Sequence, residues 1–209
     1  MIGIIDYGMG NLGSVTNACQ YLELPAKILA NPEQMPGCEA VILPGVGAFG
    51  DCMSHLESHG FVGPIKKWIA DGKPFFGICL GLQMLFEGSD ESPGVKGLGL
   101  LPGRIVKLPP STGLKIPQMG WNTVEQVQKE CPLFHNIPND AFFYFVHSFC
   151  AGNEDRSFVA GETTHGRTYA SVVWRDNVMA VQFHPEKSQK VGLRMFRNFA
   201  DWAFERVKA

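Results

Sequence analysis

The sequence has no stretch in which lysines and arginines gather, and no apolar run long enough to cross a bilayer. Its 18 basic and 20 acidic residues leave a formal net charge of −2, so neither a nucleic-acid surface nor a membrane surface is predicted. A membrane-spanning helix needs roughly 18–20 consecutive apolar residues. The first expected strand begins almost at Met1 and leaves no room for an export signal, so we expect a cytoplasmic protein.

The cysteines show no pairing pattern. They stand at positions 19, 38, 52, 79, 131 and 150, without a Cys-x-x-Cys pair, and are predicted to be free thiols rather than a disulfide framework. His55 and His59 are four residues apart on an expected helix, but no third ligand follows in a recognisable pattern, so no metal is expected. Walker-type loops and phosphate-binding glycine fingerprints are also absent from the sequence, and we expect no cofactor.

The 209 residues are 45% hydrophobic, enough to bury a substantial core, and we expect one domain over 1–209. The first half alternates strands and helices, which predicts a parallel sheet covered on both faces. The expected strands are 2–6, 26–29, 40–43 and 75–79, and the expected helices are 12–23 and 62–70. Functional residues of such sheets lie at the carboxyl ends of the strands.

The second half is predicted to be rich in strands. A segment dense in glycine and proline, 87–112, reads as loop with a short strand at 105–108. Further strands are expected at 142–148, 157–161, 168–174 and 178–183, with a hairpin turn at 175–177. The apolar stripe over 188–207 predicts a closing helix. The expected fold class is therefore α/β, with a strand-rich C-terminal half.

One cysteine stands where an expected strand meets an expected helix. Residues 74–79 form an apolar run, and the apolar spacing from Leu80 onward is helical. Cys79 therefore lies on a tight turn, with Gly77 and Gly81 leaving space around its side chain. Free N–H groups at a helix start favour the thiolate form of a cysteine. This pattern is typical of a nucleophile elbow, although a cysteine after a buried strand is as often a small core residue.

A second motif joins a histidine to a carboxylate. Pro185 disfavours the helical conformation for His184, so the segment stays extended and His184 and Glu186 share a side. An imidazole oriented by a carboxylate can accept a thiol proton, as in a Cys-His-acid triad. A surface turn would explain His-Pro-Glu alone, but it does not predict a cysteine elbow elsewhere. We therefore predict Cys79, His184 and Glu186 as catalytic residues.

Several motifs in the same order resemble the class I glutamine amidotransferases, whose glutaminase domains use a Cys-His-Glu triad. The resemblance covers essentially the whole chain, through residues 4–12, Pro44-Gly45-Val46-Gly47, the cysteine elbow, residues 119–122, residues 144–148 and residues 184–187. Pro-Gly-Val-Gly, where many related glutaminases have Pro-Gly-Gly, favours the branch that serves imidazole glycerol phosphate synthase in histidine biosynthesis. The resemblance implies a flavodoxin-like fold with a central, largely parallel sheet, and hydrolysis of L-glutamine to glutamate and ammonia.

Two further groups of site residues accompany the triad. Backbone N–H groups of the glycine-rich loop and of the elbow are suited to stabilise the negative charge that amide hydrolysis builds on oxygen; we predict Val46, Gly47 and Leu80. If the Val46 amide must rotate to face the oxyanion, the resting site would be weakly active until a partner drives that rotation. Gln83 lies one helical turn after Cys79, and the resemblance assigns glutamine contacts to Gln83, Ser148 and Phe149. His147 has no acid partner beside it and is not predicted as a second base.

The resemblance also implies a second chain, because ammonia released into water is protonated and lost. The expected partner is the cyclase subunit of imidazole glycerol phosphate synthase, in a heterodimer. The residues expected near the contact and the ammonia path are Asn11, Met119, Trp121, Asn122, Tyr144 and Lys187. Simple core packing is the alternative for Trp121 and Tyr144.

Three other functions stay open at this point. A glutaminase subunit that serves anthranilate or pyridoxal phosphate synthesis would keep the chemistry and change the partner, which copurification would reveal. A freestanding cysteine hydrolase would be active without any partner. A noncatalytic interaction module is disfavoured because all three triad residues are present.

Overall fold

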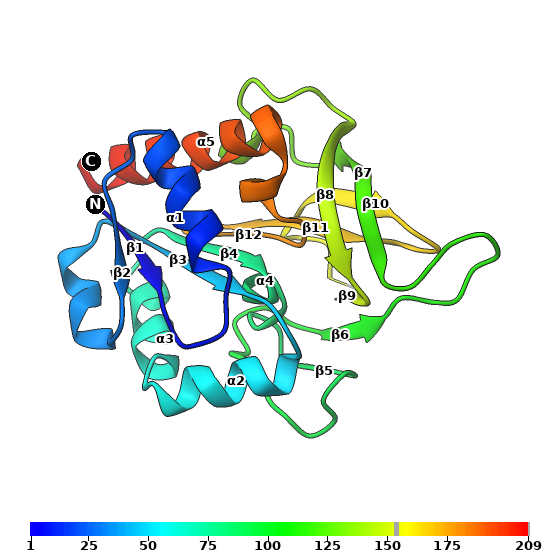
Figure 1. Cartoon of the computed structure of the whole chain (residues 1–209), viewed down its shortest axis with the longest axis horizontal. Coiled ribbons are helices and arrows are strands. Elements are labelled where there is room, and N and C mark those ends of the chain that lie inside the picture. Colours follow the sequence, from blue (N-terminus) through cyan, green and yellow to red (C-terminus); the bar gives the residue numbers. More distant parts are fainter. Residues whose placement is uncertain (153–154, 209) are drawn as a thin grey trace.

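The computed structural model describes residues 1–152 and 155–208, which form two β-sheets flanked by helices (Figure 1). The larger sheet has nine strands. Their order is β2 (Ala26–Leu29), β1 (Ile2–Ile5), β3 (Ala40–Gly45), β4 (Phe75–Cys79), β12 (Val178–Val181), β11 (Thr168–Arg175), β10 (Val159–Thr164), β7 (Gln118–Gln126) and β8 (Ala141–His147). The smaller sheet contains β5 (Gly88–Ser89), β6 (Arg104–Lys107) and β9 (Phe149–Ala151).

The first five strands of the large sheet, β2 to β12, are parallel, as the alternating pattern predicts. Strands β1, β3, β4 and β12 are buried along their whole length, since helices cover both faces. Helices α1 (Leu12–Tyr21) and α5 (Gln189–Lys208) cover one face, and α2 (Phe49–Ser58) and α3 (Val62–Ala70) the other (Figure 1). Phe76 of β4 stacks on Phe199 of α5, with ring centroids 4.8 Å apart.

The rest of the large sheet is antiparallel and continues from β12 through β11, β10 and β7 to β8. The expected turn at Asp176 joins β11 to β12. Strand β7 lacks a sequence signal, because its nine residues alternate poorly and only two of them, Gln118 and Val124, are buried. Three short 3-10 helices complete the description: Pro32–Gly37, Pro132–Phe134 and Pro185–Lys187.

The helix expected after Cys79 is much shorter than its apolar spacing predicts. Helix α4 covers only Leu80–Gln83. The next carbonyl groups accept hydrogen bonds from a returning loop: Met84 O from Leu98 N at 2.7 Å, and Leu85 O from Leu100 N at 2.8 Å. The apolar side chains that suggested a helix are buried, but loop contacts have replaced the helical hydrogen bonds.

Strand register brings the predicted site together at one edge of the sheet. Gly45 at the end of β3 is paired with Cys79 at the end of β4, and Ile78 is paired with Val181 of β12. The loop after β3, the cysteine and the segment that follows β12 therefore meet. All six cysteines are free thiols. Within the described ranges, every helix is too short or too polar to cross a membrane.

Candidate active site

Cys79 has a backbone conformation that few non-glycine residues adopt, with φ 54° and ψ −107°. The neighbouring glycines explain how the turn is accommodated. A Cβ on Gly77 would lie 2.6 Å from the Gly81 carbonyl oxygen, and one on Gly81 would overlap the Leu43 carbonyl oxygen. Helix α4 is thus packed too closely against β4 at Gly77, and against β3 at Gly81, for a side chain at either position, and the elbow holds Cys79 at the junction of β4 and α4.

The expected contact between His184 and Glu186 is present. Nδ1 of His184 is 2.8 Å from Oε1 of Glu186, and both side chains are almost fully buried. Strand β8 fixes this segment, because His184 N donates to Tyr144 O and Tyr144 N donates to Ser188 Oγ. A carboxylate at Nδ1 keeps a proton there, so Nε2 is the nitrogen left for chemistry. In the described part of the chain, Nε2 has no hydrogen-bond partner.

The charge of His184 depends on its two neighbours. Burial alone lowers the pKa of this imidazole. The Cys79 sulfur and the Glu186 carboxylate together outweigh burial and raise the pKa to about 10. The raised pKa favours the protonated ring. It can stabilise a thiolate beside it and can give its proton to a leaving group.

Cys79 and His184 line a pocket of about 190 Å³. This volume is below the roughly 300–1,000 Å³ of sites for drug-sized ligands and suits a ligand the size of one amino acid. The predicted residues that also line the pocket are Val46, Gly47, Leu80, Gln83, Ser148 and Phe149. Ser148 and Phe149 do not end a strand as expected: Ser148 separates β8 from β9, and Phe149 begins β9 in the smaller sheet.

Sequence reasoning missed two residues of this pocket, Glu91 and Val146. Glu91 lies in the loop dense in glycine and proline, and its Oε2 accepts a hydrogen bond from Phe49 N at 2.8 Å. No sequence signal separates this glutamate from other loop acids. Val146 does carry a weak signal, because it stands one residue before His147 in a predicted strand.

The loop after β3 is tied down from behind by two buried side chains. Tyr7 Oη donates to Pro44 O at 3.0 Å, and Cys52 Sγ donates to Val46 O at 3.4 Å. Gly47 has φ 102°, a conformation that favours glycine. These contacts hold the carbonyl groups of Pro44 and Val46. Val46 and Gly47 also border the pocket.

Gln83 is not free to present its amide nitrogen to a ligand. Nε2 donates to Phe149 O at 2.9 Å and to Gln182 Oε1 at 3.1 Å, which uses both hydrogens. Its carbonyl oxygen is the group left for the pocket, and such an acceptor suits an ammonium or N–H donor. The expected ligand contact by Gln83 is thereby narrowed to one atom.

His147 is held by hydrogen bonds on both ring nitrogens. Nδ1 donates to Phe149 O at 2.9 Å, and Nε2 lies 3.1 Å from Tyr169 Oη, whose hydroxyl donates to Gln118 Oε1 at 2.9 Å. Burial lowers its pKa to about 4. A neutral histidine with both nitrogens occupied orders the pocket wall.

The six residues expected near a partner lie outside the pocket lining. Asn11 caps α1 by accepting from Ser14 N at 3.2 Å, Asn122 Nδ2 donates to Thr164 O, and Lys187 ends a 3-10 helix. Met119 and Trp121 are on β7, with Trp121 paired with Tyr144 of β8 and their rings 6.0 Å apart. Trp121 is 46% exposed, so core packing does not describe it.

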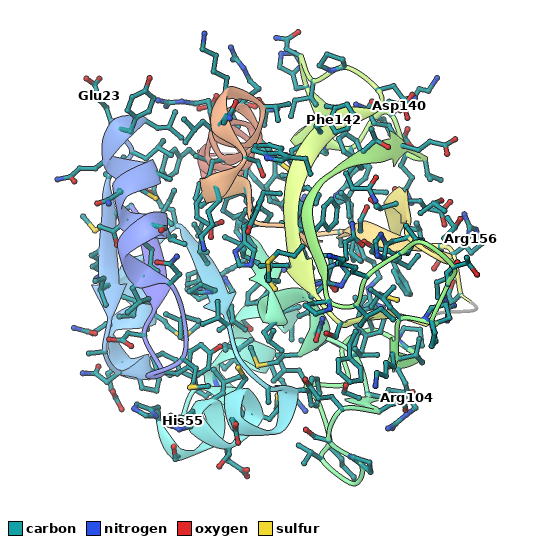
Figure 2. The ribbon with its side chains drawn as sticks, turned by 45° about the vertical axis from the view of Figure 1, so that its right-hand side comes forward. Glu23, His55, Arg104, Asp140, Phe142 and Arg156 are labelled. Carbon is teal, nitrogen blue, oxygen red and sulfur yellow. The ribbon has the colours of Figure 1, made fainter. Side chains whose placement is uncertain are left out.

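Directly opposite residues of an antiparallel pair share a face, and on this basis Met119, Trp121, Phe142, Tyr144 and Val146 share one face of the β7–β8 hairpin. We call these five residues the hairpin face. Phe142 is 58% exposed and Met119 67% exposed. Figure 2 shows Phe142 on β8 near α5, where Phe142 and Trp121 line a shallow cleft with the first residues of that helix. The hairpin face reaches the pocket at Val146.

Other parts of the described chain offer fewer groups that could bind or react with a ligand. A larger groove of about 510 Å³ is bordered by prolines and by Trp68, and its Lys67 is paired with Asp71. His55 and His59 are stacked, with ring centroids 6.1 Å apart. Among the described residues, no group of three or more potential ligands is arranged to hold a metal ion.

The chain matches a known protein family over most of its length. The family model "Glutamine amidotransferase class-I" matches residues 3–202. The chain is 50% identical over 205 residues to a Desulfitobacterium hafniense (strain DSM 10664 / DCB-2) protein named imidazole glycerol phosphate synthase subunit HisH, covering 98% of this chain and 96% of that protein. A Methanocaldococcus jannaschii protein of the same name is 47% identical over 207 residues, with 96% and 99% covered.

The fold is also similar to that of a solved structure, PurLQS from Thermotoga maritima. The TM-score is 0.76 at 19% sequence identity, with 96% of this chain and 97% of that chain covered. The matched family model spans nearly the whole sequence, and the two named relatives match it end to end. This chain belongs to the class I glutamine amidotransferases.

Proposed function

We propose that this chain is the glutaminase subunit of an imidazole glycerol phosphate synthase. It hydrolyses L-glutamine to glutamate and ammonia through a Cys79 thioester, and passes the ammonia to a cyclase subunit. The observation that carries the chemistry is the strained Cys79 elbow beside the buried His184–Glu186 pair in a pocket of amino-acid size. The partner is supported by the names of the relatives. Six free thiols suit a reducing compartment, and we propose the cytoplasm.

The first half-reaction forms the thioester. The Cys79 thiolate attacks the carboxamide carbon of glutamine, and the carbonyl electrons move to oxygen, where N–H groups of the Val46–Gly47 loop and of Leu80 are the proposed donors that stabilise the charge. The imidazolium of His184 gives its proton to the amide nitrogen as the C–N bond breaks. Ammonia leaves, and the carbonyl carbon remains bonded to sulfur.

The second half-reaction releases glutamate. Neutral His184 now accepts a proton from water, whose oxygen attacks the thioester carbon, and the C–S bond breaks to return the thiolate. Glu186 stabilises the imidazolium each time it forms, since its Oε1 faces Nδ1 at 2.8 Å. One histidine thus serves as acid and then as base, and the enzyme returns to its starting charge state.

The pocket also suits the amino-acid end of glutamine. Glu91 places a carboxylate on the wall, and the carbonyl oxygen of Gln83 is a second acceptor. Both groups favour an α-ammonium. We propose that this end of glutamine lies between them and that the peptide groups of Ser148 and Phe149 border its carboxylate.

The hairpin face is the proposed contact with the cyclase. It is apolar, partly exposed and continuous with the pocket at Val146, so a partner seated on it would cover the way out for ammonia. Asn11, Asn122 and Lys187 are the proposed polar residues around it. Phe142 joins this set, although no sequence pattern singled it out.

The test is glutamate release from L-glutamine by this chain alone, and with a cyclase subunit carrying its nucleotide ligand. We expect strong stimulation by the loaded cyclase, and loss of several orders of magnitude in turnover for Cys79→Ala. Cys131→Ala is the matched control, because Cys131 is equally buried but lies outside the pocket. Near-normal turnover in Cys79→Ala would exclude the nucleophile assignment. Equal activity with and without the cyclase would indicate a freestanding hydrolase.

A further inference from the structure

Gln182 is a fully buried polar side chain that the mechanism above does not use. It follows β12, and its backbone N–H is bonded to Ser171 O at 2.9 Å. Its side-chain Nε2 lies 3.7 Å from Cys79 Sγ, within the longer range of hydrogen bonds to sulfur. Its Oε1 accepts from Gln83 Nε2 at 3.1 Å. Gln182 therefore connects the nucleophile to a residue of the pocket wall.

The orientation of both amides in this chain of contacts is determined by chemistry. The Phe149 carbonyl can only accept, so Gln83 must turn its NH₂ group toward it. The second hydrogen of that group points at Gln182, which must answer with its carbonyl oxygen. Gln182 consequently presents its NH₂ group to the sulfur. A 180° rotation of either amide would bring two donors or two acceptors together.

We propose that Gln182 is a positioning residue that holds the Cys79 sulfur and stabilises its thiolate form by donating an N–H hydrogen bond. The inference rests on the proposed function and deepens it. His184 gains and loses a proton during each cycle, whereas the amide of Gln182 does not titrate. It offers the sulfur the same donor when the thiolate attacks and when the thiolate is expelled from the thioester. Gln83 orients the side-chain amide of Gln182. A ligand that contacts Gln83 therefore also affects the N–H group that Gln182 donates to the Cys79 sulfur.

Two variants test the proposal. Gln182→Glu keeps the volume and an acceptor for Gln83 but turns a carboxylate oxygen toward the sulfur, and Gln182→Met removes both hydrogen bonds. The probe is alkylation of Cys79 by iodoacetamide, a neutral reagent, followed by mass spectrometry of the Cys79 peptide. A hydrogen bond to a charged group contributes about 1.5–3 kcal/mol, so we expect alkylation at neutral pH to slow about 10–100-fold, more in Gln182→Glu. The pH of half-maximal alkylation should rise in both variants.

A matched control separates this effect from general damage to the core. Thr163 is buried on β10, and its Oγ1 is bonded to Thr123 O and Ser171 Oγ, away from the pocket. Thr163→Val should lower thermal stability and leave the alkylation rate and its pH profile unchanged. Alkylation at the normal rate in either folded Gln182 variant would overturn the proposal, as would an equal loss in Thr163→Val.

Steady-state glutamine hydrolysis with the loaded cyclase is the second measurement. A residue that acts on the sulfur should lower kcat by a similar factor and change KM little. Alkylation requires neither glutamine nor a partner, so the two proposals fail separately. Slowed alkylation in a chain that never hydrolyses glutamine would overturn the proposed function alone, and normal alkylation in an active glutaminase would overturn the role of Gln182 alone.

Discussion

Cys79 and His184 each carry an unfavourable free energy that their surroundings offset. The positive φ of Cys79 costs of order 1–3 kcal/mol, and it persists because the surrounding sheet and loop determine the turn. His184 and Glu186 are both buried, and each is acceptable there because of the other. The conformation of Cys79 and the burial of His184 therefore both depend on neighbouring residues.

His147 gives a prediction about acid stability. Its pKa is about 4 in the folded chain, below the ordinary value of 6.5, so between these pH values the unfolded chain binds a proton that the folded chain does not. The free energy of unfolding should fall as pH drops through this window, by about 3 kcal/mol in total. We expect His147→Asn, which keeps a donor for the Phe149 carbonyl but cannot titrate, to lose less. Urea unfolding between pH 7 and pH 4 measures both, and equal slopes would contradict the assignment.

Sequence reasoning reached residues that have a local rule and missed those that depend on the fold. Pro185 predicts the shared direction of His184 and Glu186, and the glycines predict the elbow. Glu91 comes to the pocket through a loop contact with α2, which no local pattern encodes. Gln182 could have been found, because residues two apart on an extended chain share a side and it precedes His184 by two.

Elements of the parallel half follow their apolar patterns closely, since strands buried on both faces must be continuously apolar. The expected strand at 75–79, buried at every residue, and the expected helix at 62–70 have the predicted bounds. Strand β7 could not be predicted because its residues alternate poorly between buried and exposed, and the end of α4 could not because a returning loop takes the carbonyl groups that follow it. Hydrogen bonds from distant segments can therefore override the local helix or strand propensity of a segment.

The closeness of β3 and α4 predicts the effect of one methyl group at Gly81. A Cβ on Gly81 would overlap a backbone oxygen, which cannot move aside as a flexible side chain could. We expect Gly81→Ala to lower the free energy of unfolding by about 3 kcal/mol or more and to reduce turnover. Gly63→Ala in α3 is the control, since no atom lies within 4 Å of its added Cβ, and a gain of about 0.5–1 kcal/mol is expected. Chemical denaturation measures both; a neutral Gly81→Ala would refute the packing argument.

For the whole molecule, the exposed apolar hairpin face predicts how activity depends on assembly. Trp121 is a large, half-exposed aromatic near the middle of this face, and such residues often dominate binding energy. We expect Trp121→Ala to weaken binding of the cyclase about tenfold or more and to reduce stimulation at limiting cyclase. Alkylation of Cys79 in the isolated chain should be unchanged.

Tyr21 provides the comparison for this experiment. It is 77% exposed on α1, far along the sheet from the hairpin face, and Tyr21→Ala removes a similar aromatic surface. Titration of each variant with cyclase, followed by glutamate release, compares them directly. Equal weakening by Tyr21→Ala would place the contact elsewhere on the molecule.

The strand order of the large sheet has a consequence for the newborn protein. Strand β4 leaves the ribosome long before β12, yet in the finished sheet the two are neighbours. Until β12 emerges, the nascent chain carries its reactive thiol on a strand with an unpaired edge, and the histidine that would use this thiol has not been made. The Cys79 thiol is therefore made long before the histidine that activates it, and the two come together only once β12 has paired with β4.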